Sequence, residues 1–195
     1  MGSKFKIGHM TSDQTLIDGC AKNDRACQRL LYDRYARKMF MICQRYTRTS
    51  SEAEDVLQEG FVKVFSGLKS FRGDAKLQTW LTRIFINASL NHQRQKLYLF
   101  PMVAVMNIPL VESGEMDLSQ FKLEDLLAMV KSLPDGCRVV FNLFAIEGYT
   151  HKEIAEMLGV SEGTSKSQYN RARQLLQQKI LSQEKKYEEY RKTLL

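Results

Sequence analysis

Helix boundaries, spaced along most of the chain, constrain its fold more than any other feature of the sequence. Three hydroxyl residues each stand three positions before a glutamate or glutamine, the spacing at which two side chains satisfy the first free N–H groups of a helix. These pairs are Thr11 with Gln14, Ser51 with Glu54, and Thr150 with Glu153. Apolar residues recur three to four positions apart, and no sustained two-residue alternation supports a sheet. The sequence therefore predicts an all-α fold.

The helical pattern is interrupted once, in the middle of the chain. Apolar stripes run through residues 24–46 and 52–68, and a turn at Phe71–Asp74 leads into a helix over residues 75–96. The periodicity fails from about residue 97 to 120, where two of the three prolines lie, and resumes from 121 to about 181. We therefore expect two helical domains, 11–97 and 121–181, joined by a flexible linker at 98–120. Residues 182–195 form a charged tail, and residues 1–10 read as a leader added for expression.

The charge distribution points to a polyanionic partner. The net charge is +7. Lys and Arg outnumber acids seven to one over residues 62–100, and residues 163–181 contain four basic residues and no acid. A more acidic stretch, residues 112–135, lies between these two basic blocks. Basic residues gathered in blocks are typical of nucleic-acid binding.

Several classes of function lack support in the sequence. Cys20, Cys27, Cys43 and Cys137 form no CxxC pair and no ligand cluster with the histidines, so we expect reduced thiols and no metal. No apolar run approaches the ~20 residues of a membrane span, and no secretory leader is evident, so we expect a cytoplasmic protein without membrane insertion. No phosphate-binding glycine loop, His-centred triad or paired carboxylate site stands out. We expect no enzymatic activity, no cofactor and no small-molecule substrate.

Residues 148–176 have the order of a helix-turn-helix. Thr150 is placed to cap the first helix, Gly159 to end it in the left-handed conformation, and Ser161 to cap the second helix. The second helix carries donors for phosphates and base edges and no carboxylate after Glu162. These donors are Ser165, Lys166, Gln168, Tyr169, Asn170, Arg171 and Arg173. The alternative is a basic amphipathic helix at a solvated surface.

A polar stripe marks the helix over residues 75–96. Thr79, Arg83, Asn87 and Asn91 recur every four residues and so lie on one face. Amides can bond base edges and arginine can meet phosphate, while a nearby aromatic can stack on an unpaired base. From these residues alone, an ordinary solvated face explains the stripe equally well.

Two collinear stretches resemble regions 2 and 4 of the extracytoplasmic-function sigma factors of bacterial RNA polymerase. The first comprises residues 51–65 (SEAEDVLQEGFVKVF), Ser70–Asp74, Thr79–Ile84 and Asn87. The second comprises Leu133-Pro134, Gly148–Thr150, Glu153–Ala155, Gly163-Thr164 and Arg171–Arg173. Together they cover about residues 13–181 in the family's order. The resemblance assigns residues 11–97 to region 2 and residues 121–181 to region 4.

The resemblance implies a sigma factor that directs core RNA polymerase to specific promoter DNA under the control of an anti-sigma factor. Core polymerase would be bound by Asp55, Gln58, Glu59, Phe61 and Val62. The opened −10 element would be captured by Phe71, Arg72, Lys76, Thr79, Trp80, Arg83, Asn87 and Asn91. The −35 duplex would be read by Thr164, Lys166, Ser167, Asn170, Arg171 and Arg173.

The chain also departs from the family's usual pattern. Ser165 stands where many relatives have an apolar residue, and Gln168 and Asn170 replace commoner basic or bulky residues, so the promoter sequence does not carry over. The apolar residues within 97–106 are not a general family feature and are candidates for the anti-sigma contact. A helix-turn-helix regulator that is not a sigma factor is the alternative, although it explains only the C-terminal half.

Overall fold

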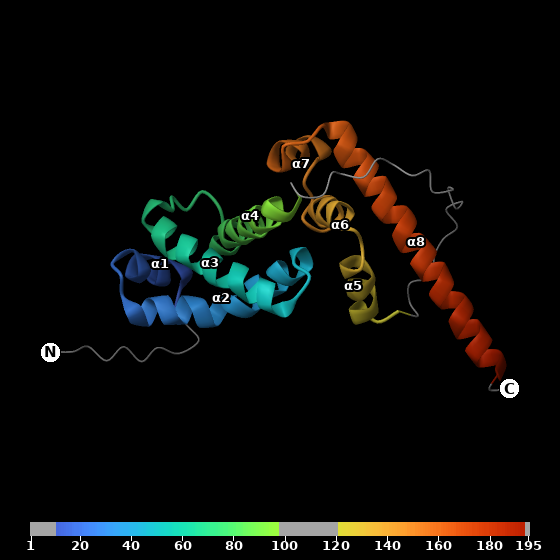
Figure 1. Cartoon of the computed structure of the whole chain (residues 1–195). Coiled ribbons are helices and arrows are strands. Elements are labelled where there is room, and N and C mark those ends of the chain that lie inside the picture. Colours follow the sequence, from blue (N-terminus) through green and yellow to red (C-terminus); the bar gives the residue numbers. More distant parts are fainter. Residues whose placement is uncertain (1–10, 98–120, 194–195) are drawn as a thin grey trace. The chain divides into compact units, whose positions relative to one another are not determined.

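The computed structural model describes residues 11–97 and 121–193, and these residues are helical without any strand (Figure 1). The predicted all-α class is confirmed. The chain divides into two compact units between Asn91 and His92. The predicted leader and linker lie outside the described residues.

The N-terminal unit contains three α-helices, one short 3-10 turn and most of a fourth α-helix, whose last turns follow the boundary at Asn91. They are α1 (Asp13–Ala21), α2 (Arg25–Tyr46), α3 (Ser50–Gly67), η1 (Leu68–Ser70) and α4 (Leu77–Leu97). Helix α2 packs against both α1 and α3. Asp24 caps α2, because its carboxylate accepts a hydrogen bond from the Ala26 N–H at 2.8 Å.

Two predicted helix caps are wrong by one or two residues. Helix α1 is capped by Ser12 and not by Thr11, and α3 is capped by Thr49 and not by Ser51. In each case several hydroxyl residues are adjacent in sequence, and local spacing cannot choose among them. For α3 the side chain of Glu52 also accepts from the Arg48 N–H at 2.9 Å, which fixes the earlier start.

An aromatic cluster forms the centre of the N-terminal core. The Phe61 ring lies 4.6 Å from the Tyr32 ring and 5.1 Å from the Phe85 ring, measured between centroids. The Phe85 ring of α4 lies directly over Gly60 of α3, which has no side chain. A Cβ at Gly60 would lie 2.2 Å from Cε1 of Phe85, so any larger residue would displace the Phe85 ring.

The C-terminal unit is built around one long helix. Its elements are α5 (Leu123–Lys131), α6 (Asp135–Phe141), η3 (Asn142–Ile146), α7 (His151–Leu158) and α8 (Glu162–Thr193). The segment η3 is a π-helical turn that continues directly from α6. Both α6 and α7 pack on α8. Two apolar clusters fill the interior, one of Phe121, Met129 and Ile180, the other of Leu133, Cys137 and Ala172.

Candidate nucleic-acid interfaces

One face of α4 is polar and exposed from Thr79 to Asn91. Its residues are Lys76 just before the helix, then Thr79, Arg83, Asn87 and Asn91. The other face is buried through Leu77, Leu81, Phe85 and Ala88. The structure therefore brings together the stripe that the sequence predicted and leaves its donors open to a partner.

An aromatic pair lies at the start of this stripe. The rings of Phe71 and Trp80 are 5.0 Å apart and inclined by 52°, and both side chains are half-buried. Gly73, in the turn between them, has a φ of 78°, a conformation that favours glycine. Arg72 beside it is exposed. A half-buried aromatic pair next to amides and arginine can hold an unstacked base.

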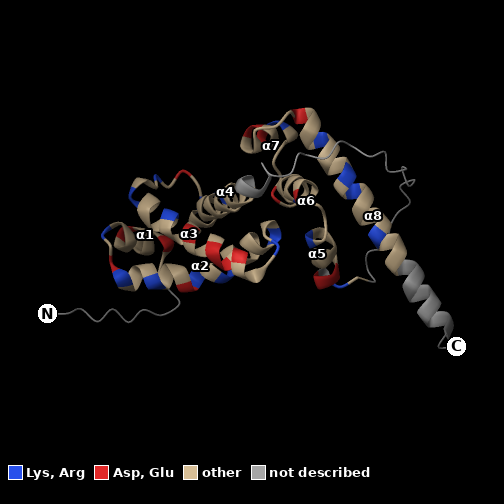
Figure 2. Ribbon diagram, viewed as in Figure 1, with Lys and Arg blue, Asp and Glu red and all other residues tan. Residues whose placement is uncertain are grey.

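Helix α3 presents an exposed acidic face (Figure 2). Asp55, Gln58 and Glu59 are exposed, and Val62 is 69% exposed. Phe61, which the resemblance put in the same set, is only 3% exposed and belongs to the aromatic core. Phe61 belongs to the apolar stripe of residues 52–68, and this position in the sequence indicates that its side chain is buried.

The helix-turn-helix has the predicted caps. The Thr150 Oγ1 accepts from the Glu153 N–H, and the Glu153 carboxylate accepts from the Thr150 N–H at 2.8 Å. Gly159 ends α7 with a φ of 69°, in the left-handed region. Ser161 Oγ then accepts from the Thr164 N–H at 3.0 Å and caps α8. The Thr150–Glu153 capping box, the left-handed Gly159 and the Ser161 cap together fix the turn between the two helices.

Basic residues recur along the described part of α8 after Glu162 (Figure 2), and the outer face of this part is basic and polar. Lys166, Asn170 and Arg173 are exposed, whereas Thr164, Ser167 and Arg171 are half-buried. The Lys166 ammonium lies 2.7 Å from the Glu162 carboxylate and, by donating to it, lowers the pKa of Glu162. The one acid of this face is thereby paired by the helix itself. Such a face suits phosphates and base edges.

Two of the expected donors on α8 point inward. Ser165 is fully buried and Gln168 is 7% exposed, so the prediction that they offer donors to DNA is wrong. Tyr169 is half-buried against Phe141 and Phe144. Ser165 and Gln168 share a helical face with the buried Ala172, and this spacing in the sequence indicates that they are buried.

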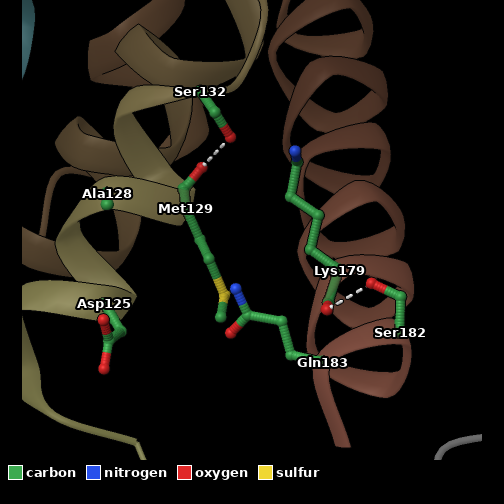
Figure 3. Close-up of a pocket in the computed structure, with 7 residues that line it drawn as sticks. All are labelled: Asp125, Ala128, Met129, Ser132, Lys179, Ser182 and Gln183. Atoms are coloured by element: carbon green, nitrogen blue, oxygen red, sulfur yellow. Dashed lines mark hydrogen bonds between the residues drawn. The ribbon is translucent and has the colours of Figure 1, made fainter. Parts of the chain in front are cut away.

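A groove of about 310 Å³ separates α5 from the later part of α8 (Figure 3). Its lining side chains come from both helices: Asp125, Ala128, Met129, Ser132, Lys179, Ser182 and Gln183. The hydroxyls of Ser132 and Ser182 donate to carbonyls of their own helices. None of the residues predicted to bind DNA or polymerase lines this groove.

The described residues include neither a candidate metal site nor a membrane-spanning helix. No group of three or more His, Cys, Asp or Glu side chains within them could hold a metal ion. None of the described helices is both long enough and apolar enough to cross a membrane. All four cysteines are free thiols.

Comparison with known proteins connects both units to one family. Sigma-70 region 2 matches residues 31–97, and sigma-70 region 4 matches residues 123–176. The ECF RNA polymerase sigma-E factor of Escherichia coli (strain K12) is 30% identical and is aligned over 89% of this chain and 97% of its own length.

Two solved structures align with this chain. CnrH, solved in complex with the cytosolic domain of CnrY, aligns with a TM-score of 0.48 and 23% identity, covering 87% of this chain and 97% of its own. The sigma factor RpoE of Bartonella quintana, solved with the anti-sigma factor NepR, aligns with a TM-score of 0.47 and 21% identity, covering 79% and 96%.

Proposed function

Because this chain belongs to the family of extracytoplasmic-function RNA polymerase sigma factors, which direct core polymerase to specific promoters, we propose that its two units divide promoter recognition between them. The N-terminal unit, as region 2, holds polymerase and the opened −10 element. The C-terminal unit, as region 4, reads the −35 duplex. The protein acts in the cytoplasm by binding and catalyses no reaction of its own.

The exposed polar stripe of α4 is the main observation that supports this division of promoter recognition between the two units. Unstacking a base costs a few kcal/mol, so a protein that captures opened DNA must supply compensating contacts. Asn87 and Asn91 offer amides for base edges, and Arg83 offers a charge for phosphate. The Phe71–Trp80 pair supplies an aromatic surface at one end of the stripe. We assign Arg72, Lys76 and Thr79 to the same −10 surface.

The outer face of α8 suits a closed duplex. The second helix of a helix-turn-helix enters the major groove with its N-terminal residues toward the bases. Lys166 and Asn170 lie within the first three turns of α8, and Arg173 follows one turn later. We assign Thr164, Ser167 and Arg171 to the same −35 surface, at its less exposed side.

The acidic face of α3 suits a basic partner on core polymerase. Asp55 and Glu59 are exposed one turn apart, with Val62 as an exposed apolar contact beside them. Glu59 is paired with Lys63, so Asp55 is the more available charge. Phe61 supports this surface from the core side, through its packing on Tyr32.

The experiment that tests this function is transcription in vitro with cognate core polymerase and a genomic promoter library. We expect the full chain to direct initiation at a defined set of promoters. Absence of initiation with active core polymerase would contradict the proposal. A helix-turn-helix regulator that is not a sigma factor would instead bind duplex DNA without core polymerase. This alternative does not explain the region 2 match over residues 31–97.

An anti-sigma factor is the expected regulator. The proposed −10 and −35 surfaces are exposed polar faces, and a protein that covers them would prevent DNA binding. The test is to co-purify the chain from its native organism and add the purified partner to the transcription reaction. A partner that leaves initiation unchanged is not the regulator proposed.

A further inference from the structure

The inner face of α8 is polar at two positions where its neighbours are apolar. Ser165 is fully buried, and its Oγ shares a hydrogen bond of 2.9 Å with Nδ1 of His151, the first residue of α7. Gln168 is 7% exposed, and its Oε1 accepts a hydrogen bond from the Cys137 thiol of α6 at 3.0 Å. One face of α8 is thus bonded, side chain to side chain, to two different helices.

The His151 ring is held on more than one side. It stacks on the Phe144 ring with centroids 4.2 Å apart and planes inclined by 12°. The Tyr169 ring of α8 meets it edge-on at 5.8 Å. Phe144 comes from η3, the π-helical turn that precedes α7. The imidazole therefore lies where η3, α7 and α8 meet.

The two bonds restrict the rotation of α8 about its own axis. Advancing an α-helix by one residue turns it by about 100°. Such a turn would carry Ser165 away from His151 and Gln168 away from Cys137 at the same time. Each buried group would then lack a partner, which is costly in an apolar interior. Apolar contacts alone are less directional and permit small rotations.

We propose that these two pairs, Ser165–His151 and Gln168–Cys137, form a polar lock that fixes the rotation of α8 and thereby selects which side chains face the −35 duplex. His151 is a positioning residue in this scheme and makes no contact with DNA. Ser165 directly precedes the outward Lys166, and Gln168 lies between Lys166 and Asn170, so the burial of these two residues determines the direction of the outer face. The inference rests on the proposed role of α8 in reading duplex DNA.

The test compares variants of the full chain, assembled with core polymerase, on a promoter that the wild-type protein uses. The measured quantity is −35 discrimination, the ratio of affinities for the intact promoter and for one with a scrambled −35 element. His151→Phe keeps a ring against Phe144 and removes Nδ1. His151→Asn returns a polar atom near the position of Nδ1. Ile180→Val trims a buried residue of the other apolar cluster and serves as the stability control.

We expect His151→Phe to reduce −35 discrimination about tenfold, the size of one net hydrogen bond. His151→Asn should recover most of that ratio, and Ile180→Val should lower the melting temperature without changing the ratio. Ser165→Ala should add little to the loss in His151→Phe, because both changes remove the same bond. Gln168→Met, which keeps length and removes Oε1, should reduce the ratio independently.

The proposed lock is overturned if His151→Phe keeps the −35 discrimination of the wild-type protein. It is also overturned if Ile180→Val reduces −35 discrimination as much as His151→Phe does. A failure of the lock is distinct from a failure of the proposed function. If wild-type protein directs initiation and reads the −35 element but His151→Phe does so equally well, only the lock is wrong. If wild-type protein directs no initiation, the sigma-factor function itself fails.

Discussion

At the residue scale, α4 presents amides where an ordinary solvated helix would carry charges. Asn is a poor helix former, so two of them on one exposed stripe cost stability unless they bind something. We expect Asn87→Ala to weaken holoenzyme binding to single-stranded −10 DNA about tenfold while binding to −35 duplex is unchanged. Fluorescence anisotropy with the two DNA probes measures both. Gln78→Ala, exposed on another face of α4, is the matched control, and equal losses on both probes would contradict the assignment.

The two arginines of α8 should behave differently. Arg173 is exposed, whereas Arg171 is half-buried and its Nε is enclosed by protein. Both Arg173→Ala and Arg171→Ala should weaken −35 duplex binding and leave −10 binding intact. Arg171→Ala should also cost about 1 kcal/mol of folding stability, because its stem packs against the protein. DNA-binding assays and chemical denaturation of both variants measure these effects. Equal losses of folding stability in Arg171→Ala and Arg173→Ala would show that the burial of Arg171 does not contribute to stability.

Thiol reactivity should report the packing of the N-terminal unit. Burial raises the pKa of Cys43 to about 12, and burial is also the main cause that raises the pKa of Cys20 to about 11. These thiols stay neutral in the folded protein, so they favour folding below the ordinary thiol pKa of 9.0 and this contribution declines as the pH rises above it. We expect iodoacetamide at pH 8 to modify the half-buried Cys27 first. Mass spectrometry of the labelled peptides measures the order, and early labelling of Cys43 would contradict it.

Sequence reasoning succeeded for exposed residues and failed where a polar residue is buried. The stripe of Asn87 follows from helical spacing alone, and the structure exposes it as expected. The sequence predicts that Ser165 and Gln168 are exposed, because polar residues usually are. Their partners, His151 and Cys137, lie 14 and 31 positions away, and only the fold brings them into contact. A buried hydrogen-bonded pair has no local signature in sequence.

At the element scale, the capping box of α7 should determine whether the helix-turn-helix forms. Thr150 and Glu153 bond each other's backbone N–H groups at the start of this eight-residue helix. We expect Thr150→Ala to destabilise the C-terminal unit by about 1 kcal/mol and to weaken −35 binding with it. Thr150→Ser, which keeps the hydroxyl, is the control. Denaturant unfolding followed by circular dichroism gives the free energies, and a serine variant as unstable as the alanine one would exclude the cap as the cause.

Helix boundaries were predictable where one candidate cap stood alone. Thr150, Gly159 and Ser161 have no competing residue at the right spacing, and all three act as predicted. At the starts of α1 and α3 adjacent hydroxyls compete, and for α3 the hydrogen bond from the Arg48 N–H to Glu52 fixes the start at Thr49. The π-helical turn of η3 has no signal in the sequence pattern, and in the structure Phe141 and Phe144, at and within this turn, contact Tyr169.

At the scale of the whole molecule, the proposed −10 and −35 surfaces belong to different compact units of one chain. Changes at distant sites without shared partners usually add in free energy. We therefore expect the double variant Asn87→Ala, Arg173→Ala to weaken holoenzyme binding to a complete promoter by the sum of the two single effects, within about 0.5 kcal/mol.

Additivity matters because it separates two ways in which a two-unit sigma factor can recognise DNA. If each unit binds its own element, the losses add. We propose that Arg173 contacts a phosphate, in which case it contributes to the salt dependence of binding, whereas the uncharged Asn87 does not. Removing Arg173 should lower the slope of log affinity against log salt by about one, and removing Asn87 should leave that slope unchanged. Titrations of both single variants and the double variant across a salt series measure these quantities. A double variant no weaker than its worse parent would mean that one unit must engage before the other can contribute.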